Sequence, residues 1–257
     1  MSRTFIHQDL TGGRWIPSWL RHQQATRYMW AESFVSGKRV LEVGCGSGAG
    51  CLRLLSAGAG EVMGIDVDAD AVRLARDNHS SQNLEFEVVR DSQFPVADGG
   101  FDVVVALETI EHVQNDVQFV EELARVLNPG GILLLSTPNR LITNPATSIT
   151  DRPLNPLHVR EYTRRELGSL LENKFEDLDW YGQTFFLAGI PSMLNTIGRV
   201  SPAAAVRVRQ AMRLALSPLD TSRRHQPRPT PDGREGEVLV LKCGKSSPDE
   251  QGRQTDG

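Results

Sequence analysis

The sequence predicts an α/β fold in which a mostly parallel β-sheet carries helices on both faces. Stretches with the pattern of buried strands alternate with helical stretches over most of the 257 residues. The glycine-rich stretch "VLEVGCGSG" (residues 40–48) begins within the first of these strands. Because ligands bind at the carboxyl ends of the strands in such sheets, we expect a ligand site beside these glycines.

The first half of the chain supplies four of the expected strands. A helix beginning near Pro17 precedes them. Apolar runs predict the strands 39–43, 61–66, 84–90 and 101–107. Helices are expected at about 48–57, at 69–79 with Asp68 as the N-cap, and at 116–127 before an Asn-Pro-Gly stop.

The second half is less regular. It supplies a strand at 131–137, a helix at 163–174 that starts with a capping box of Thr163 and Glu166, and strands at 175–187 and 236–244. Residues 188–235 interrupt the pattern with a basic apolar helix (203–216) and a proline-rich linker. This helix could cover the pocket, pair with a second subunit in a homodimer, rest on a membrane surface or simply pack.

Composition sets the remaining expectations. The chain is 39% hydrophobic and 23% charged, as in an ordinary soluble domain, and a net charge of -4 gives no general attraction for nucleic acid. The N-terminus lacks the apolar core of a signal peptide, and the apolar stretch "FFLAGIPSML" is too short to span a bilayer. Three cysteines without zinc spacing indicate reduced thiols. We therefore expect a cytoplasmic protein without an integral membrane segment or a nucleic-acid partner.

The glycine-rich stretch fits two classes of ligand. Gly44 and Gly46, with Ala49, match a loose dinucleotide fingerprint, so a nicotinamide cofactor must be considered. Glu42 favours S-adenosylmethionine instead, because a carboxylate attracts an ammonium and a sulfonium and repels a pyrophosphate. Asp66, about 20 residues further on, suits the ribose of either ligand.

Four motifs then occur in order: "VLEVGCGSG", "GIDVD", "RDSQFPVADGGFDVVVALETIEHV" and "LNPGGILLLSTPN". Together they resemble class I S-adenosylmethionine-dependent methyltransferases of the type 11 and ubiquinone-biosynthesis O-methyltransferase kind. The resemblance covers about residues 38–140 strongly and the rest loosely. It implies S-adenosylmethionine as cofactor and a Rossmann-like sheet of seven strands with an antiparallel last strand, for which 236–244 is the candidate.

The resemblance also implies a role for individual residues. The glycines would line the cofactor, with Glu42 near its methionine part. Asp66 would hold the ribose, Val67 would pack on the adenine, and Asp91 and Ser92 would contact the adenine edge. The segment after the fourth strand would face the methionine end. The expected cofactor-binding residues are Glu42, Gly44, Cys45, Gly46, Gly48, Asp66, Val67, Asp91, Ser92 and Leu107. Alternatively, the glycines serve only a tight turn, Cys45 fills space, Asp66 caps the next helix and Asp91 is a solvated loop acid.

Two histidines are the main candidates for chemistry. His112 follows the fourth strand together with Glu108 and Glu111, and it could act as a base toward a hydroxyl. In the ubiquinone-biosynthesis relatives such a Glu-x-x-Glu-His cluster can hold a divalent ion; alternatively it bonds loop backbone or caps the next helix. His158 lies with Glu161 in a possible lid, where both could meet substrate or His158 could tie the loop to residues 136–140. We expect His112, Glu108 and His158 to be catalytic.

The segments expected from these patterns are a helical cap (1–37), the S-adenosylmethionine-binding core (38–187), the insertion (188–235), the last core strand (236–245) and a disordered tail (246–257). Residues of the cap that could line the acceptor site are Arg14, Trp15, His22, Arg27 and Tyr28, although Trp15, Trp19 and Trp30 could instead be core. The expected activity is methyl transfer to oxygen, or nitrogen, of a small acceptor such as a sugar, a quinone-like compound or a secondary metabolite. A cofactor-binding module without catalysis and a nicotinamide-dependent oxidoreductase are the rivals.

Overall fold

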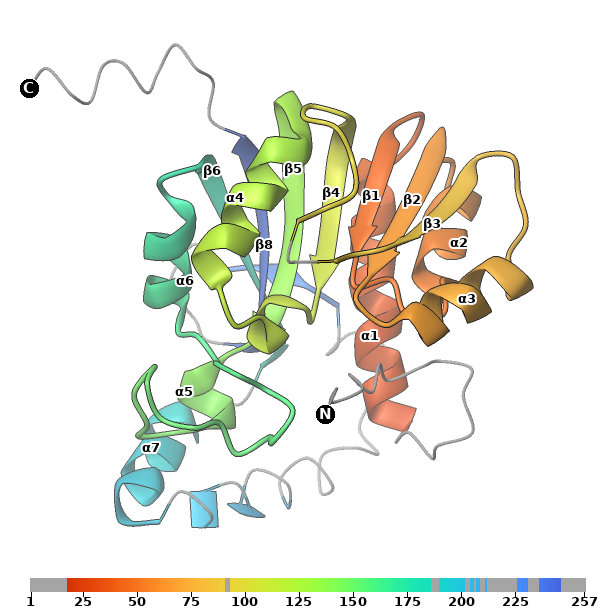
Figure 1. The fold of residues 1–257 in the computed structure, drawn as a ribbon. Coiled ribbons are helices and arrows are strands. Elements are labelled where there is room, and N and C mark those ends of the chain that lie inside the picture. The colour runs from red at the N-terminus through yellow and green to blue at the C-terminus, as the bar shows by residue number, and fades with distance from the viewer. Residues whose placement is uncertain are drawn as a thin grey trace, which may run out of the picture.

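A computed structural model of the chain describes residues 18–90, 93–185, 190–201, 204–205, 207–208, 211, 226–230 and 236–245. Within them the strands form a single sheet in the order β3-β2-β1-β4-β5-β8-β6-β7 (Figure 1). The strands are β1 (Arg39–Val43), β2 (Glu61–Asp66), β3 (Leu84–Val88), β4 (Phe101–Leu107), β5 (Leu127–Pro138), β6 (Phe175–Phe185), β7 (Arg228–Pro229) and β8 (Gly236–Lys245).

The topology confirms a mostly parallel sheet with an antiparallel last strand. The pairs from β3 to β5 are parallel, whereas β8 lies antiparallel to both β5 and β6. Among the described residues the sheet has eight strands and not the expected seven, because the short strand β7 pairs with β6 at two positions. A strand of two residues has no periodicity, so the pattern of the sequence could not predict it.

Helices cover both faces of the sheet, as predicted. Val40 packs with residues of α2 and α3 in one apolar cluster, whereas its neighbour Leu41 packs with residues of α4 and α6 in the other. Figure 1 shows α4 in front of the sheet. The helices are α1 (Ser18–Ala31), α2 (Ala49–Ser56), α3 (Ala69–Asn78), α4 (Asp116–Val126), α5 (Arg140–Thr143), α6 (Arg164–Leu171) and α7 (Ile190–Val200), with short 3-10 helices η1 (Glu32–Phe34) and η2 (Ile110–His112).

The second half of the chain differs further from expectation. The fifth strand begins at Leu127, directly after α4, so the Asn-Pro-Gly stretch lies inside β5 and not before it. Helix α7 was not predicted, yet Pro191 lies in its first turn, where a missing N–H has no cost. The predicted helix 203–216 is described only at 204–205, 207–208 and 211, which are helical, and the tail 246–257 lies outside the described residues.

Among the described residues, no helix has both the length and the apolar character needed to cross a membrane.

Candidate functional site

The loop after β1 needs its glycines. Gly44, Gly46 and Gly48 have φ angles of +80°, +53° and +82°, in the left-handed region that side chains disfavour. At Gly48, a Cβ would also lie 2.6 Å from the ring of Phe86. The turn is pinned to β2, because the amide of Gly46 donates to Asp66 Oδ2 at 2.9 Å. The loop therefore forms a cradle of backbone at the carboxyl edge of the sheet.

Asp66 anchors this cradle and does not cap α3. Its other oxygen, Oδ1, accepts from the amide of Asp68 at 2.9 Å, whereas Asp68 caps the helix through the amides of Asp70 and Ala71. The alternative role of Asp66 as a helix cap is thus wrong. Val67 follows it at the strand end and is 54% exposed. The predicted adenine contacts Asp91 and Ser92 lie outside the described residues.

Glu42 is buried beneath the N-terminal helix. Its Oε1 accepts a hydrogen bond from the hydroxyl of Tyr28 in α1. Burial, and next the charge of Glu42, raises the pKa of Tyr28 well above its usual value, so the phenol stays protonated and donates. A Cβ on Gly50 would lie 2.2 Å from the same Glu42 oxygen, which shows how closely α2 also approaches this carboxylate.

Cys45 packs into the core. It contacts the apolar cluster beneath α2 together with Cys51. The hydrogen bond from the Cys51 thiol favours a Cys45 thiolate, but burial and the charges of Glu42 and Asp66 outweigh it and raise the pKa of Cys45. Burial likewise raises the pKa of Cys51. The side chain of Cys45 therefore fills space in this apolar cluster.

Glu108 is held in a strained position at the end of β4, directly after the half-buried Leu107. Its φ is +53°, which is uncommon for a residue with a side chain. Ser136 on β5 fixes it: the Ser136 carbonyl accepts from the Glu108 amide at 2.9 Å, and the Ser136 hydroxyl donates to Glu108 Oε1 at 2.9 Å. Arg27 Nη2 lies 3.8 Å from the other oxygen, Oε2. Backbone strain of this kind is concentrated at functional sites.

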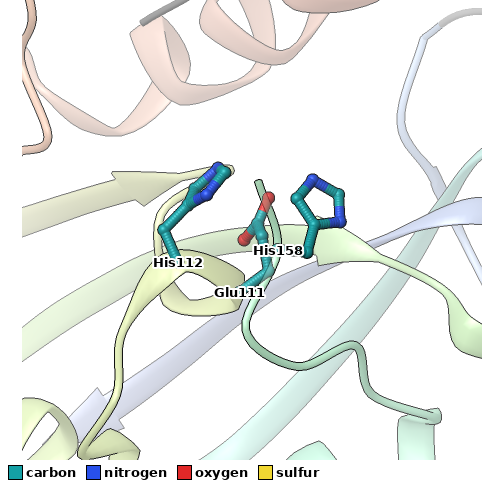
Figure 2. A group of neighbouring side chains, drawn as sticks. All are labelled: Glu111, His112 and His158. Carbon is teal, nitrogen blue, oxygen red and sulfur yellow. The ribbon is translucent and has the colours of Figure 1, made fainter. Parts of the chain in front are cut away.

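Three side chains meet just beyond Glu108. Figure 2 shows the carboxylate of Glu111 between the rings of His112 and His158. Possible ligand atoms of the three all lie within 4.8 Å of one another, and the two rings meet edge to face with centroids 5.0 Å apart. The group that could hold a divalent ion thus contains Glu111 and His112, as the motif suggests, together with His158, whereas Glu108 is not part of it.

Glu111 is the acid of this cluster, and it is only 1% exposed. Burial, and next the negative charge of Glu108, raises the pKa of Glu111 well above its usual value. The hydroxyl of Thr137 donates to Glu111 Oε2 at 3.0 Å, which compensates only in part. The site thus favours the protonated form of Glu111.

His112 has a defined orientation. Its Nδ1 lies 3.0 Å from the carbonyl oxygen of Leu157, which can only accept, so Nδ1 carries the proton in the neutral ring. The lone pair of the ring is then on Nε2. The amide of Val159 donates to the Glu111 carbonyl at 2.7 Å. These bonds fold the segment around residue 157, the predicted lid, against η2.

His158 holds this lid together. Its Nδ1 lies 2.6 Å from Glu161 Oε1, and its Nε2 lies 2.8 Å from the Asn155 amide nitrogen. Glu161 is buried and also accepts from Thr143 and Asn144. Burial alone would raise the pKa of Glu161, but these hydrogen bonds outweigh it and lower the pKa. His158 therefore ties the lid, through the buried Glu161, to the end of α5, beyond the predicted residues 136–140.

The residues expected at the acceptor site divide into three groups. Arg27 and Tyr28 are turned inward toward Glu108 and Glu42, whereas His22 is exposed. Trp30 packs edge to face on Phe34 and Tyr181, which supports its alternative role in the core. Arg14 and Trp15 lie outside the described residues, and so does the side chain of Trp19.

Sequence reasoning missed Ser136, Thr137 and Gln183. Ser136 and Thr137 follow the apolar run of β5, Gln183 lies in the mixed polar strand β6, and all three are fully buried. Such a residue must find a hydrogen-bond partner, and this is the signal that could have marked them. Their partners lie 26 to 160 residues away in the chain, which the sequence does not specify.

Known proteins resemble this chain in sequence and in fold. A family model described as "Methyltransferase domain" matches residues 34–181. A probable S-adenosylmethionine-dependent methyltransferase of Mycolicibacterium smegmatis is 38% identical, over 72% of this chain and 71% of that protein. A solved structure from Thermotoga maritima, described as an S-adenosylmethionine-dependent methyltransferase and possible histamine N-methyltransferase, superimposes with a TM-score of 0.58 at 16% identity, covering 89% of this chain and 93% of that one.

Two more distant relatives carry named activities. A ubiquinone biosynthesis O-methyltransferase of Thiobacillus denitrificans is 38% identical, over 41% of this chain and 47% of its own length. A norajmaline N-methyltransferase of Rauvolfia serpentina is 34% identical, over 44% of this chain and 40% of its own length. The chain therefore spans less than half of each of these two proteins.

These comparisons decide between the two cofactors that the glycines allow. The family implies S-adenosylmethionine, and the nicotinamide alternative finds no support in it. The residues present fit this ligand. The loop turns through three positive φ angles and leaves no room for a side chain at Gly48. An acid, not a base, stands at the end of β2 (Asp66) and directly after β4 (Glu108). By sequence and by fold, the chain belongs to the class I S-adenosylmethionine-dependent methyltransferases.

Proposed function

We propose that this chain transfers a methyl group to an oxygen or nitrogen atom of a small-molecule acceptor, with His112 as the general base. A sugar, a quinone-like compound or a secondary metabolite is the expected acceptor. The O- and N-methyltransferases among the relatives support this chemistry. The observation that carries the proposal is the orientation of His112, whose Nδ1 faces the Leu157 carbonyl beside Glu111 and His158.

The cofactor would occupy the cradle after β1. Bound S-adenosylmethionine supplies an activated methyl group and its own leaving group. We assign its methionine part to the glycine loop and Glu42, and its ribose and adenine to the ends of β2 and β3. The residues of this proposed lining are Glu42, Gly44, Cys45, Gly46, Gly48, Asp66, Val67, Asp91, Ser92 and Leu107.

His112 would take the proton that an acceptor hydroxyl or ammonium loses during attack. A neutral imidazole with its proton on Nδ1 can accept at Nε2, and such base catalysis contributes typically 10²–10⁴-fold. Glu108, fixed by Ser136, would accept a hydrogen bond from a polar hydrogen of the acceptor or from the ammonium of the cofactor. His158, bonded at both nitrogens, would orient the lid above them.

Calorimetry and a panel of acceptors test the proposal. We expect S-adenosylhomocysteine to bind the wild type, and His112→Ala to keep this affinity while turnover with a radiolabelled methyl donor falls about 100-fold or more. His79→Ala is the matched control, because this histidine lies at the end of α3 and contacts Phe86. It should change neither quantity.

The outcomes separate the alternatives. Absence of S-adenosylhomocysteine binding would overturn the whole proposal. Full activity of His112→Ala would overturn the assignment of the base. If the wild type binds the cofactor but methylates nothing in a broad panel, the chain is a cofactor-binding module without catalysis.

The same cluster supports a second arrangement. A carboxylate and two imidazoles within 4.8 Å are a donor set that zinc accepts. Glu111, which would have to lose its proton, would then hold a divalent ion together with His112 and His158, whose Nε2 would exchange Asn155 for the ion. This ion would orient the acceptor, and His112 would not be the base. Metal analysis of the purified protein decides: a stoichiometric ion that His158→Asn removes and Glu108→Gln retains would favour this arrangement over base catalysis.

A further inference from the structure

Helix α1 reaches two acids of the site with two consecutive side chains. Tyr28 donates to Glu42, which lies on β1, and Arg27 faces Glu108, which follows β4. These two strands are neighbours in the sheet, with Glu42 paired to Val105. Helix α1 therefore contacts the site at two points, and its packing is not only apolar.

Arg27 is held rigidly. It is 1% exposed, and its Nη1 donates to Gln183 Oε1 on β6 at 2.9 Å. The amide nitrogen of Gln183 in turn donates to the Gln23 carbonyl and the Thr26 hydroxyl of α1, each at 2.8 Å. Gln183 thus makes three hydrogen bonds to α1, and one of them holds the guanidinium of Arg27.

The guanidinium faces Glu108 from the side opposite to Ser136. One carboxylate oxygen accepts from the Ser136 hydroxyl, and the other lies 3.8 Å from Arg27 Nη2. The side chain of Glu108 keeps 26% of its surface exposed, whereas that of Arg27 keeps 2%. An arginine charge is permanent, and an ion pair with one sealed partner is screened less than a surface pair. Because Glu108 is partly exposed and Arg27 is not, Glu108 is the group through which Arg27 can act on a ligand.

We propose that Arg27 is a positioning residue that acts through Glu108. It holds the carboxylate in the strained geometry at the end of β4, with its exposed part turned to the acceptor, and so makes α1 a component of the active site. The inference rests on the proposed function, because the role of Glu108 is assigned there.

A double-mutant cycle tests this coupling. The variants are Arg27→Met, Glu108→Gln and the double variant, and the readouts are kcat, the KM of the acceptor and the affinity for S-adenosylhomocysteine. We expect Arg27→Met to lower kcat at least tenfold in the wild-type background but less than twofold in the Glu108→Gln background. Arg27→Lys, which keeps the charge, should recover a substantial part of kcat.

Arg164→Met is the matched control. Arg164 also packs on β6, with its guanidinium 5.0 Å from the ring of Trp180 and a hydrogen bond to the Thr230 carbonyl, but no contact with Glu108 is among those described for it. We expect it to lower thermal stability and leave kcat within twofold. If Arg27→Met does not fold, Arg27→Gln, which also removes the charge, takes its place in the cycle with Glu108→Gln.

Independent losses in kcat and in cofactor affinity would overturn the inference, and so would an Arg27→Met variant that loses only stability. The failure of the proposed function looks different, because the wild type itself would then be inactive. In that case the readout of the cycle is the affinity for S-adenosylhomocysteine. Additive effects of the two substitutions on this affinity would overturn the positioning role of Arg27.

Discussion

The glycines near β1 differ in what a side chain would meet. Gly48 has φ +82°, and its added Cβ would lie 2.6 Å from Phe86 Cζ and 3.0 Å from the Ala75 Cβ. Gly37, before the same strand, has φ +69° but nothing within 4 Å. The two positions therefore separate the conformational strain of a left-handed residue from the loss of space.

We expect Gly48→Ala to be more destabilising than Gly37→Ala. Both pay roughly 1–2 kcal/mol for the left-handed backbone, and overpacking adds about 1–3 kcal/mol at Gly48 alone. Urea denaturation measures the two losses, and calorimetry with S-adenosylhomocysteine should show weakened binding only for Gly48→Ala. Equal losses in both variants, with unchanged affinity, would mean that the cradle is not fitted to a ligand.

Glu111 makes stability depend on pH in an unusual direction. Burial and the charge of Glu108 raise the pKa of Glu111 in the folded state, so the native state binds more protons than the unfolded state above the ordinary pKa of a glutamate. Stability is then lost as the pH rises from about 4.3 through the folded-state pKa. We expect Glu111→Gln to flatten this decline and to be more stable than the wild type near neutral pH.

Comparison of the wild type with Glu111→Gln reports on Glu111 itself, because the charged and titratable groups around it are present in both proteins. These groups are Glu108, Glu161, His112 and His158. Denaturant unfolding at several pH values from 4 to 8 gives the two curves. The exposed Glu85 on β3 is the control, and Glu85→Gln should leave the slope as it is in the wild type. A Glu111→Gln variant with an unchanged slope would contradict the buried, protonated carboxyl.

At the scale of the element, the lid depends on one buried carboxylate. Glu161 accepts from His158, Thr143 and Asn144, so it joins the lid to the end of α5. We expect Glu161→Gln to cost about 1–3 kcal/mol, because an amide nitrogen would face groups that need an acceptor. Hydrogen exchange should become faster between residues 144 and 158.

Asp151→Asn is the control variant, because it alters an exposed loop contact in the same segment. Asp151 accepts from the Ser148 amide at 2.7 Å but is fully exposed, so water can replace it. Its exchange pattern should remain that of the wild type. Equal acceleration in both variants would show that the lid does not depend on Glu161.

The elements themselves were largely predictable because their signals are local. The strands 61–66 and 101–107 agree with β2 and β4 residue for residue, and Asp68 and Thr163 cap α3 and α6 as expected. The site was predictable only in part. The motifs placed the glycines and His112, but the bond of Arg27 to Gln183 spans 156 residues. No periodicity encodes such a contact, since it arises only when the sheet has assembled.

At the scale of the molecule, the site depends on strands from both ends of the chain. β8 lies between β5 and β6, and it pairs with β5 from Ile132 to Pro138. β5 carries Ser136 and Thr137, which bond Glu108 and Glu111, and β6 carries Gln183, which holds Arg27. The last strand in sequence therefore supports both sides of a site that it does not itself enter.

Truncation tests this dependence. Deletion of residues 246–257 removes no described pairing of the sheet, so we expect cooperative unfolding and wild-type affinity for S-adenosylhomocysteine. Deletion of residues 236–257 also removes β8, which strips β5 and β6 of their shared partner and exposes their backbone groups. We expect the longer deletion to abolish cooperative unfolding, measured by circular dichroism, together with cofactor binding. A soluble longer deletion that binds S-adenosylhomocysteine like the wild type would show that β1, β4 and the glycine loop form the site without the far half of the sheet.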